Sequence, residues 1–422
     1  MKKLVIILST IMLFAACKSD DSNEEIKADR TVIIYISGEC SLWDYVDPDL
    51  NELKSGSQTI GDNNLVVYVD RSLTRETPWL ARIYKGQFVD SVSVIDIAQK
   101  MNFTPAKTSI TDDPYSSEAQ VMEGVLRYAL NKYPSKNNDY GLVLWGHGSG
   151  WLLKDSVAYH AMGRQRAYGV DNGRNTDDDN GKWLNIPSMA KVLSKIPHLS
   201  FIFCDCCNMM CLEVAYELRH VTDYIIGSPA EIPGVGAPYY TVVPALFEKT
   251  TFWKSIVDRY YEQRAGYYDL PLSVIKTSEM ENLANATKTV LKTFAGSFDD
   301  NEKYPDLSDL IHYYYDYYGG DRQIYYDAND FILKYASTNE YNTWKSVLDQ
   351  TVIYKKMATR WMTYLVPRHG AWTTFFGDFE MTEEKYGGVS MFIPQWKYQF
   401  THNETIKQMG WYYAAGYSDI GW

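Results

Sequence analysis

Two reactive side chains follow apolar segments that have the form of buried β-strands. His147 comes two residues after the segment 140–145, and a group of cysteines begins at the end of the segment 199–204. Neighbouring strands of a parallel sheet bring such loops together at their carboxyl ends, where the active sites of open α/β folds lie. A cysteine hydrolase needs at least a thiol and an imidazole that lie close together. The sequence therefore predicts hydrolytic chemistry carried by a cysteine and His147.

The glycines around His147 favour a functional role over a structural one. Gly146 and Gly148 flank this histidine, whereas a histidine that is merely packed in a core has no need of such neighbours. Glycine lets a substrate backbone approach closely and frees a backbone N–H to point at a developing oxyanion. The other six histidines have no comparable setting.

The four cysteines at and after the end of the second predicted strand have different expected roles. They lie within eight residues of one another and are Cys204, Cys206, Cys207 and Cys211. A zinc site is disfavoured because adjacent ligands fit tetrahedral chelation badly. Cys204 and Cys211 are most simply small core residues. Cys206 or Cys207 then emerges at the strand end, before a predicted helix whose amino-terminal dipole would favour a thiolate.

Two motifs resemble the clostripain family of cysteine peptidases. Residues 205–207 (DCC) and 213–218 (EVAYEL) are similar to the nucleophile region of that family, and residues 142–151 (LVLWGHGSGW) to its histidine segment. The likeness extends over residues 30–395. It implies that Cys207 attacks the scissile carbonyl of a polypeptide, while His147 protonates the leaving amine and later activates water. It also implies an oxyanion hole formed by the backbone N–H groups of Gly148 and Cys207.

The resemblance also implies a preference for arginine or lysine on the acyl side of the cleaved bond. Asp205 occupies the position that shapes the specificity pocket in the family, and Ser228 opens the substrate-binding loop at 228–239. A carboxylate beside the nucleophile is a natural partner for a guanidinium. The alternative is an aspartate that only caps a helix or faces solvent. The Asn-rich segment that usually follows the first strand is absent, and its contact to the basic side chain is missing or replaced by Cys40 or Ser41.

Self-cleavage and calcium are two further expectations from the resemblance. Family members cut themselves after a basic residue between the histidine and cysteine segments, where Lys154, Arg164, Arg166 and Arg174 lie. The sequence requires no cofactor. Calcium activation in the family keeps the acidic run 171–181 as a candidate Ca²⁺ site, but its spacing does not fit an EF-hand. We favour a solvated acidic surface loop there, and we assign no metal ligand.

The order of the predicted elements indicates an α/β fold. Strands are expected at 31–37, 65–70, 80–84, 140–145, 199–204, 224–227, 272–277 and 387–394. Helices are expected at 121–130, 186–196, 209–221 and 279–294, the first opened by a capping box at 117–120. This alternation favours a doubly wound, mainly parallel sheet. The resemblance implies a caspase-like three-layer sandwich, followed by a mostly helical carboxy-terminal part packed on it.

The amino terminus has the form of an export signal. Residues 1–17 combine two lysines, a short apolar run and small residues, and they end in a sequence that resembles a lipoprotein processing box with Cys17 as the lipidated residue. Residues 18–29 form an acidic tether, which resembles a surface-export signal in one group of Gram-negative bacteria. We expect a surface-exposed lipoprotein of the outer membrane; an ordinary cleaved signal with a secreted product is the alternative. A catalytic core at 30–267 and a carboxy-terminal part at 268–422 follow.

Composition and net charge narrow the classes of molecule that the protein is expected to bind. The chain has 422 residues and a net charge of −12, which disfavours nucleic acid. Membrane contact is expected only through the lipid anchor, and the oligomeric state is left open. We favour half-buried side chains as the explanation of the 35 tyrosines. A tyrosine- and tryptophan-rich exterior would instead support one rival from another class, a non-catalytic surface protein that keeps the peptidase fold and binds glycan or protein.

Overall fold

The computed structural model describes residues 28–71, 76–105, 113–153, 167–173, 181–264, 269–298, 303–314, 323–368 and 371–422. The predicted signal peptide with Cys17, and the four basic residues expected at the self-cleavage site, lie outside these ranges. Residues 18–27 of the predicted tether also lie outside these ranges. Its last two residues already belong to the fold, because Ala28 is buried and its carbonyl accepts a hydrogen bond from the N–H of Lys136.

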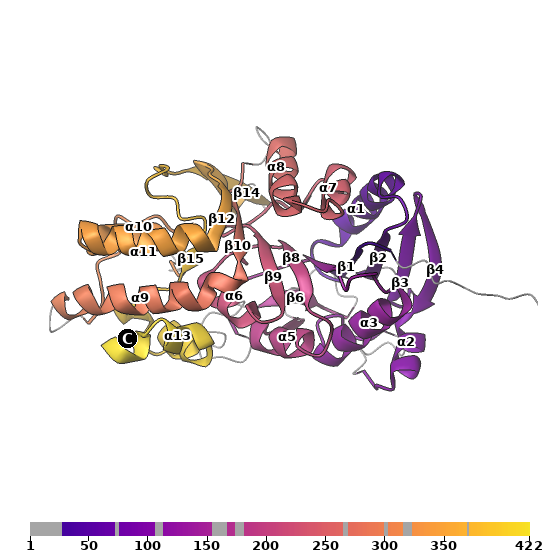
Figure 1. The fold of residues 1–422 in the computed structure, drawn as a ribbon, viewed down its shortest axis with the longest axis horizontal. Helices are drawn as coiled ribbons and strands as arrows, with labels where there is room; N and C mark the ends of the chain where they lie inside the picture. Colours follow the sequence, from indigo (N-terminus) through magenta and orange to yellow (C-terminus); the bar gives the residue numbers. More distant parts are fainter. Residues whose placement is uncertain are drawn as a thin grey trace, which may run out of the picture.

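A central sheet of nine strands organises the described part of the chain (Figure 1). Its strands are β1 (Thr31–Gly38), β2 (Asn64–Arg71), β3 (Trp79–Tyr84), β4 (Gln87–Ser93), β5 (Tyr140–Trp145), β8 (Leu199–Asp205), β9 (Thr222–Gly227), β10 (Leu272–Lys276) and β12 (Val352–Lys356). They lie in the order β12-β10-β9-β8-β5-β1-β2-β3-β4. The five strands from β9 to β2 are parallel, and the strands at both edges are antiparallel. The predicted mainly parallel sheet is confirmed.

Helices cover both faces of this sheet, because the side chains of its central strands are buried on both faces. In β1, Ile33 and Tyr35 enter one core cluster, while Val32, Ile34 and Ile36 enter the other. Helices α1 (Trp43–Gly56), α7 (Tyr239–Leu246) and α8 (Phe252–Arg264) pack on one face. Helices α2 (Val94–Met101), α3 (Ala119–Lys132), α5 (Ile186–Leu193), α6 (Leu212–Leu218) and α9 (Met280–Phe294) pack on the other. Strands buried on both faces explain the continuous apolar runs in the sequence.

The carboxy-terminal part completes the sheet and adds smaller elements. β10 and β12 lie beyond residue 268, yet they extend the sheet from β9. Within the described ranges, the other α-helices are α10 (Ala328–Tyr335), α11 (Thr338–Thr351), α12 (His402–Thr405) and α13 (Gly410–Ala414). Two two-stranded pairs of this part join β11 (Tyr326–Asp327) with β15 (Ser390–Met391), and β13 (Arg360–Arg368) with β14 (Ala371–Asp378). Another pair, within the catalytic core, joins β6 (Tyr168–Asp171) with β7 (Lys182–Leu184). The sequence predicted neither the β13–β14 hairpin nor β12.

Three local predictions were wrong, and tertiary contacts explain them. The helix predicted at 209–221 is only α6, because the N–H of Met210 donates to Ser228 and its carbonyl accepts from Ser390, which holds extended backbone there. The strand predicted at 387–394 shrinks to β15. The capping box at 117–120 does not form, because the Ser117 hydroxyl donates instead to the carbonyl of Lys182, 2.8 Å away.

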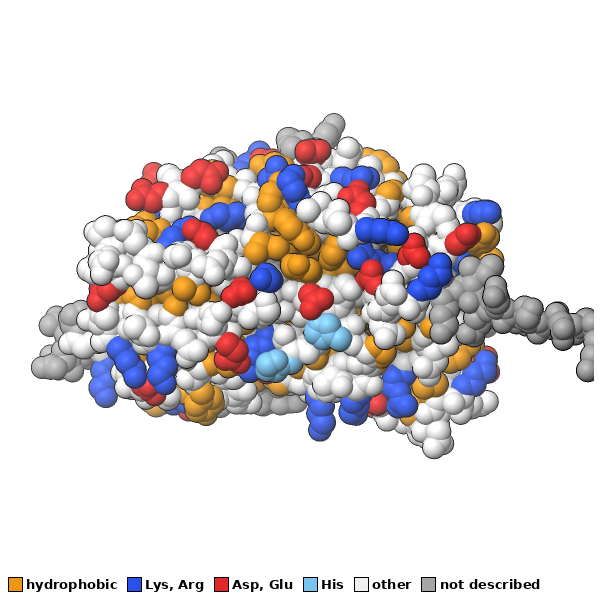
Figure 2. Space-filling view, in the orientation of Figure 1, with side chains coloured by type: hydrophobic (Ala, Val, Ile, Leu, Met, Phe, Trp, Pro, Cys, Tyr) orange, Lys and Arg blue, Asp and Glu red, His pale blue; other side chains and the backbone are white. Residues whose placement is uncertain are grey.

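The surface in Figure 2 mixes charges of both signs. Acidic and basic side chains alternate across this face, and neither sign gathers into a large field. Among the described residues, no helix is long and apolar enough to cross a membrane.

Candidate active site

Strand register brings the two predicted catalytic residues to the same level. In the parallel pair β5–β8, Trp145 lies opposite Asp205, and each is the last residue of its strand. His147 and Cys207 both follow two residues later. The two side chains therefore leave neighbouring strands together at the carboxyl edge of the sheet, where an α/β fold forms its active site.

Gly148 packs directly against the backbone of Cys207. A Cβ atom on Gly148 would lie 2.6 Å from the carbonyl oxygen of Cys207 and 3.2 Å from its nitrogen, so only glycine fits. The carbonyl of His147 and the N–H of Ser149 both bond to the β6 segment. Gly148 lies between these two bonded residues. In an antiparallel bridge of this kind, the N–H of the residue in that position points away from the partner strand. The N–H of Gly148 thus points away from β6, as a donor to an oxyanion must.

The imidazole of His147 is held by a residue from the loop after β1. The Oγ atom of Ser41 lies 2.9 Å from Nε2 of His147, and the Trp183 ring lies 6.2 Å away, centroid to centroid. Ser41 is exposed, whereas Cys40 is buried with its Sγ 3.8 Å from the carbonyl of Ser37. Of the two residues considered for this loop, Ser41 therefore reaches the site and Cys40 does not. No sequence signal distinguished them.

Burial separates the two adjacent cysteines. Cys206 is 1 % exposed and belongs to the core cluster under α5 and α6, whereas Cys207 is only partly buried. The Cys207 sulfur accepts a hydrogen bond from the N–H of Ile232 at 3.3 Å. Both are free thiols, so they form no vicinal disulfide. Cys207 is thus the cysteine that a substrate can reach.

The surroundings of Cys207 favour its neutral thiol form. Burial, and then the charge of Glu231, raise the pKa of Cys207 well above its usual range. The predicted helix dipole does not oppose this shift, because α6 begins five residues later and the dipole field decays within the first turn. The raised pKa thus opposes the thiolate form that the sequence led us to expect.

Asp205 lies beneath the loop that follows β9. Its carboxylate is 3 % exposed and accepts hydrogen bonds from the N–H of Ala237, and from the hydroxyls of Tyr239 at 2.7 Å and Tyr260 at 3.2 Å. Burial raises the pKa of Asp205, and these hydrogen bonds oppose the rise. Gly236, at φ +52°, lets the loop touch the carboxylate. Asp205 neither caps a helix nor faces solvent, so that alternative is wrong.

Ser228 shapes the same loop from inside. Its side chain is fully buried, and its Oγ accepts a hydrogen bond from the N–H of Ala230 at 3.1 Å. Its carbonyl accepts from the N–H of Met210. This position does not support a direct contact between Ser228 and substrate.

The carboxy-terminal part braces both catalytic loops, which the sequence did not reveal. The hydroxyl of Tyr325 donates to the carbonyl of Ser149 at 2.7 Å, and the N–H of Ser390 donates to the carbonyl of Met210. Gly150, at φ +57°, leaves room for the Tyr325 ring. These contacts join segments far apart in the sequence, so no local pattern predicts them.

Comparison with known proteins assigns the family. The model of the clostripain family, peptidase C11, matches residues 34–415. The chain belongs to the clostripain family of cysteine peptidases. It is therefore a hydrolase that acts on polypeptides, and the predicted caspase-like α/β fold is confirmed.

Solved clostripain-family structures resemble this peptidase over nearly its whole length. A secreted C11 cysteine protease from Bacteroides thetaiotaomicron, in complex with an irreversible peptide inhibitor, is 30% identical; the match covers 93% of this chain and 100% of that one, with a TM-score of 0.72. An inactive zymogen C11 protease from Parabacteroides distasonis is 27% identical, covers 92% and 98%, and has a TM-score of 0.72. No curated protein sequence matches the chain.

Proposed function

We propose that this clostripain-family peptidase is an endopeptidase that cleaves after arginine or lysine, with Cys207 as nucleophile and His147 as general acid and base. One observation carries the proposal. Gly148, next to His147, touches the backbone of Cys207 at the carboxyl edge of the sheet, while Cys206 is enclosed in the core. The loops therefore bring one accessible thiol and one imidazole to the same place.

The two residues divide the chemistry between them. The Cys207 thiol gives its proton to His147 as sulfur attacks the scissile carbonyl. The C–N bond then breaks, His147 returns the proton to the leaving amine, and a thioester remains on Cys207. In the second half His147 takes a proton from water, the hydroxide attacks the thioester, and the proton returns to sulfur. Ser41, bonded to Nε2, orients the ring for these transfers.

Backbone N–H groups stabilise the charge that develops on the carbonyl oxygen. The N–H of Gly148 points away from β6, and the nitrogen of Cys207 lies beside Gly148. Two such fixed donors match the tetrahedral intermediate, and each is worth about 10²- to 10³-fold in rate.

Asp205 supplies the charge for a basic substrate side chain. Its carboxylate lies two residues before the nucleophile under the 228–239 loop, and neutral donors from Tyr239 and Tyr260 hold it. A guanidinium or ammonium group of the substrate that binds beside this loop would be attracted by the negative charge of Asp205. This arrangement supports cleavage after Arg or Lys.

Hydrolysis of fluorogenic peptides ending in Arg, Lys, Ala or Asp tests the proposal. Cleavage after Arg and Lys is expected to disappear in Cys207→Ala and to persist in Cys206→Ala, the matched neighbour. Activity that survives in Cys207→Ala would assign the nucleophile elsewhere. If the wild type cleaves none of the peptides and does not cleave casein, the result would favour the non-catalytic binding protein.

Self-cleavage between the histidine and cysteine segments is part of the same proposal. The support is the resemblance and the presence of Lys154, Arg164, Arg166 and Arg174 in that interval. Amino-terminal sequencing of the purified protein should show a second terminus directly after one of these residues. Cys207→Ala should remain a single polypeptide. A cut that also appears in this variant would be the work of another protease.

We also propose export with a lipid anchor at Cys17, at the outer-membrane surface. The support is the signal-like sequence of residues 1–17, and a relative described as secreted. Metabolic labelling with radioactive palmitate should mark the wild type and spare Cys17→Ala. Equal absence of label from both proteins would favour an ordinary cleaved signal. Protease treatment of intact cells then tests surface exposure.

A further inference from the structure

Arg264, the last residue of α8, holds the 228–239 loop by two of its carbonyl groups. Nε of Arg264 donates a hydrogen bond to the carbonyl of Gly236 at 3.0 Å, and Nη2 donates to the carbonyl of Val235 at 3.1 Å. A guanidinium is planar and presents its donors as a rigid fork, so one side chain fixes two successive carbonyls. The motifs in the sequence did not single out this arginine.

Asp205 holds the other end of the same peptide group. Its carboxylate accepts a hydrogen bond from the N–H of Ala237 at 3.1 Å. The peptide between Gly236 and Ala237 therefore gives its oxygen to Arg264 and its hydrogen to Asp205. Because the C=O and N–H of a trans peptide point in opposite directions, the cation and the carboxylate lie at opposite ends of one peptide dipole. Each charge has the sign that the nearer end of the dipole attracts, so the peptide is clamped in one orientation.

A turn connects this clamp to the nucleophile. The N–H of Gly236 donates to the carbonyl of Pro233 at 2.9 Å, which closes a turn over residues 233–236. Ile232 directly precedes the turn, and its N–H donates to the sulfur of Cys207 at 3.3 Å. Holding the turn therefore also holds the loop in its place beside Cys207.

The charge of Arg264 also favours the ionised form of the acids around it. Burial raises the pKa of Asp205, and its hydrogen bonds and then the charge of Arg264 oppose this rise. The same guanidinium charge opposes the rise that burial causes in the pKa values of Asp49 and Glu52, both on α1. Arg264 thus helps to keep on Asp205 the negative charge that attracts a basic side chain.

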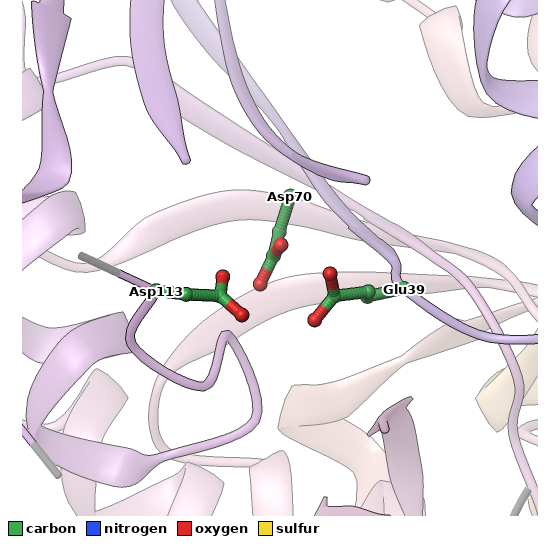
Figure 3. Close-up of side chains that lie close together, drawn as sticks. All are labelled: Glu39, Asp70 and Asp113. Carbon is green, nitrogen blue, oxygen red and sulfur yellow. The ribbon is translucent and has the colours of Figure 1, made fainter. Parts of the chain in front are cut away.

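A second group of buried acids lies at the carboxyl ends of β1 and β2 and orders a different segment (Figure 3). Its members are Glu39, Asp70 and Asp113. The N–H of Ser116, in the segment that leads into α3, donates to the carboxylates of Asp70 and Asp171 at 3.2 and 2.6 Å. Asp171 is buried, so the acidic run expected as a solvated loop begins inside the protein; residues 174–180 of that run lie outside the described ranges. These contacts order the segment before α3, whereas Asp205 orders the 228–239 loop.

We propose that Arg264 is a positioning residue for substrate specificity, because it fixes the Gly236–Ala237 peptide against Asp205. The proposal rests on the function proposed above, in which the basic side chain of the substrate binds beside the 228–239 loop. Arg264 acts through the loop and through Asp205 rather than by contact with substrate. Loss of its fork should weaken the binding of a basic side chain equally in the ground state and in the transition state, which raises KM and leaves kcat unchanged.

Steady-state hydrolysis of an Arg peptide tests this role. In Arg264→Ala we expect KM to rise about tenfold or more at an unchanged kcat, since a hydrogen bond to a charged group typically contributes about a factor of ten or more. Arg264→Lys keeps the charge but not the planar fork, so its KM should lie between those of the wild type and Arg264→Ala. Arg259→Ala is the matched control, because Arg259 lies on the same helix and donates to the carbonyl of Thr241 at 3.0 Å, in α7 and after the loop. It should keep the wild-type KM.

Three kinetic results would overturn the proposal. The first is a wild-type KM in Arg264→Ala, and the second is an equal rise of KM in Arg264→Ala and Arg259→Ala. The third is a lower KM in Arg264→Ala, which would show that Arg264 competes with the substrate for Asp205.

Hydrogen exchange measures the clamp without catalysis. In Cys207→Ala protein, the amide of Ala237 should exchange about tenfold faster or more once Arg264→Ala is added, because local opening of the loop becomes easier. Adding Arg259→Ala instead should leave the exchange rate unchanged. Unchanged exchange in the Arg264→Ala protein would overturn the proposal. If the wild type cleaves no peptide at all, the proposed function fails and the role in specificity fails with it, whereas hydrogen exchange still decides whether Arg264 holds the loop.

Discussion

The protonation state of the Cys207 sulfur determines how this peptidase reacts with substrates and inhibitors. Burial, with the charge of Glu231, raises the pKa of Cys207 above that of an ordinary thiol. Only the thiolate reacts with iodoacetamide, and an exposed cysteine with a pKa of about 8.5 is largely ionised by pH 9.5. We therefore expect alkylation of folded Cys207 to be slow at pH 7 and still to accelerate above pH 9.5.

Mass spectrometry of the peptide that contains Cys207 measures this rate against pH. The same peptide from urea-unfolded protein is the control, and its rate should level off near pH 9.5. A folded-state rate that reaches its plateau near pH 7 would contradict a raised pKa.

The contact at Gly148 predicts a second effect on single residues. In Gly148→Ala the new methyl group would lie 2.6 Å from the Cys207 carbonyl oxygen, which is backbone and cannot move aside cheaply. The displaced N–H should weaken the oxyanion hole, and we expect a fall in kcat of about 10²- to 10³-fold. Gly296→Ala is the control, because its Cβ would meet no atom within 4 Å. Unchanged kcat in Gly148→Ala would remove Gly148 from the oxyanion hole.

The apolar pattern of the sequence does not show which of the two adjacent cysteines, Cys206 or Cys207, faces the core. Side chains at successive positions of a strand point in opposite directions, but Cys206 and Cys207 lie in the bend and turn that follow the end of β8 at Asp205, so this alternation does not decide which of them faces the core. Which one does so depends on where β8 ends and how the chain turns, and the apolar pattern does not contain that information. The family resemblance selected Cys207, and the burial of Cys206 agrees with it.

Elements with a strong pattern were predictable, and elements fixed by distant contacts were not. The sequence predicted β1, β5 and β8 almost to the residue, because strands buried on both faces leave long apolar runs. It overextended α6, where contacts to Ser228 and Ser390 hold the chain extended. Such contacts join segments far apart in the sequence and leave no local periodicity, so the bracing of the active site by the carboxy-terminal part stayed invisible.

Helix α1 contributes a titratable group that should make stability depend on pH. Asp49 is buried, accepts a hydrogen bond from Nε1 of Trp145 in β5, and has its pKa raised to about 8, mainly by burial and then by the charge of Asp205. The folded protein thus keeps a proton that the unfolded chain releases above about pH 4. The free energy of unfolding should therefore fall as pH rises from 4 to 8.

Asp49→Asn removes this titration and keeps an oxygen for Trp145. Between pH 5 and 8 the variant should lose less stability than the wild type, by up to about 4 kcal/mol, since each pH unit contributes at most about 1.4 kcal/mol. Urea unfolding at the two pH values measures the difference. If the free energies of unfolding of wild type and variant differ by the same amount at pH 5 and at pH 8, Asp49 does not titrate in this range.

At the scale of the whole molecule, the expected activating cut passes between strands that remain neighbours. The piece before the interval 154–174 carries β1 to β5, and the piece after it carries β8, yet β5 and β8 pair along their length. Arg30 of the first piece donates to the carbonyls of Leu246 and Glu248 in the second, at 2.8 and 2.9 Å. Both core clusters also draw residues from both pieces.

The two pieces should therefore stay together after cleavage. Most of this interface is apolar, so salt should not dissociate it, whereas denaturant should. We expect two bands on a denaturing gel but a single gel-filtration peak at the position of uncut Cys207→Ala protein, in low salt and in 1 M NaCl alike. Because His147 lies in one piece and Cys207 in the other, hydrolytic activity should follow that peak. Separate elution of the pieces with activity retained in one of them would contradict a catalytic site shared across the cut.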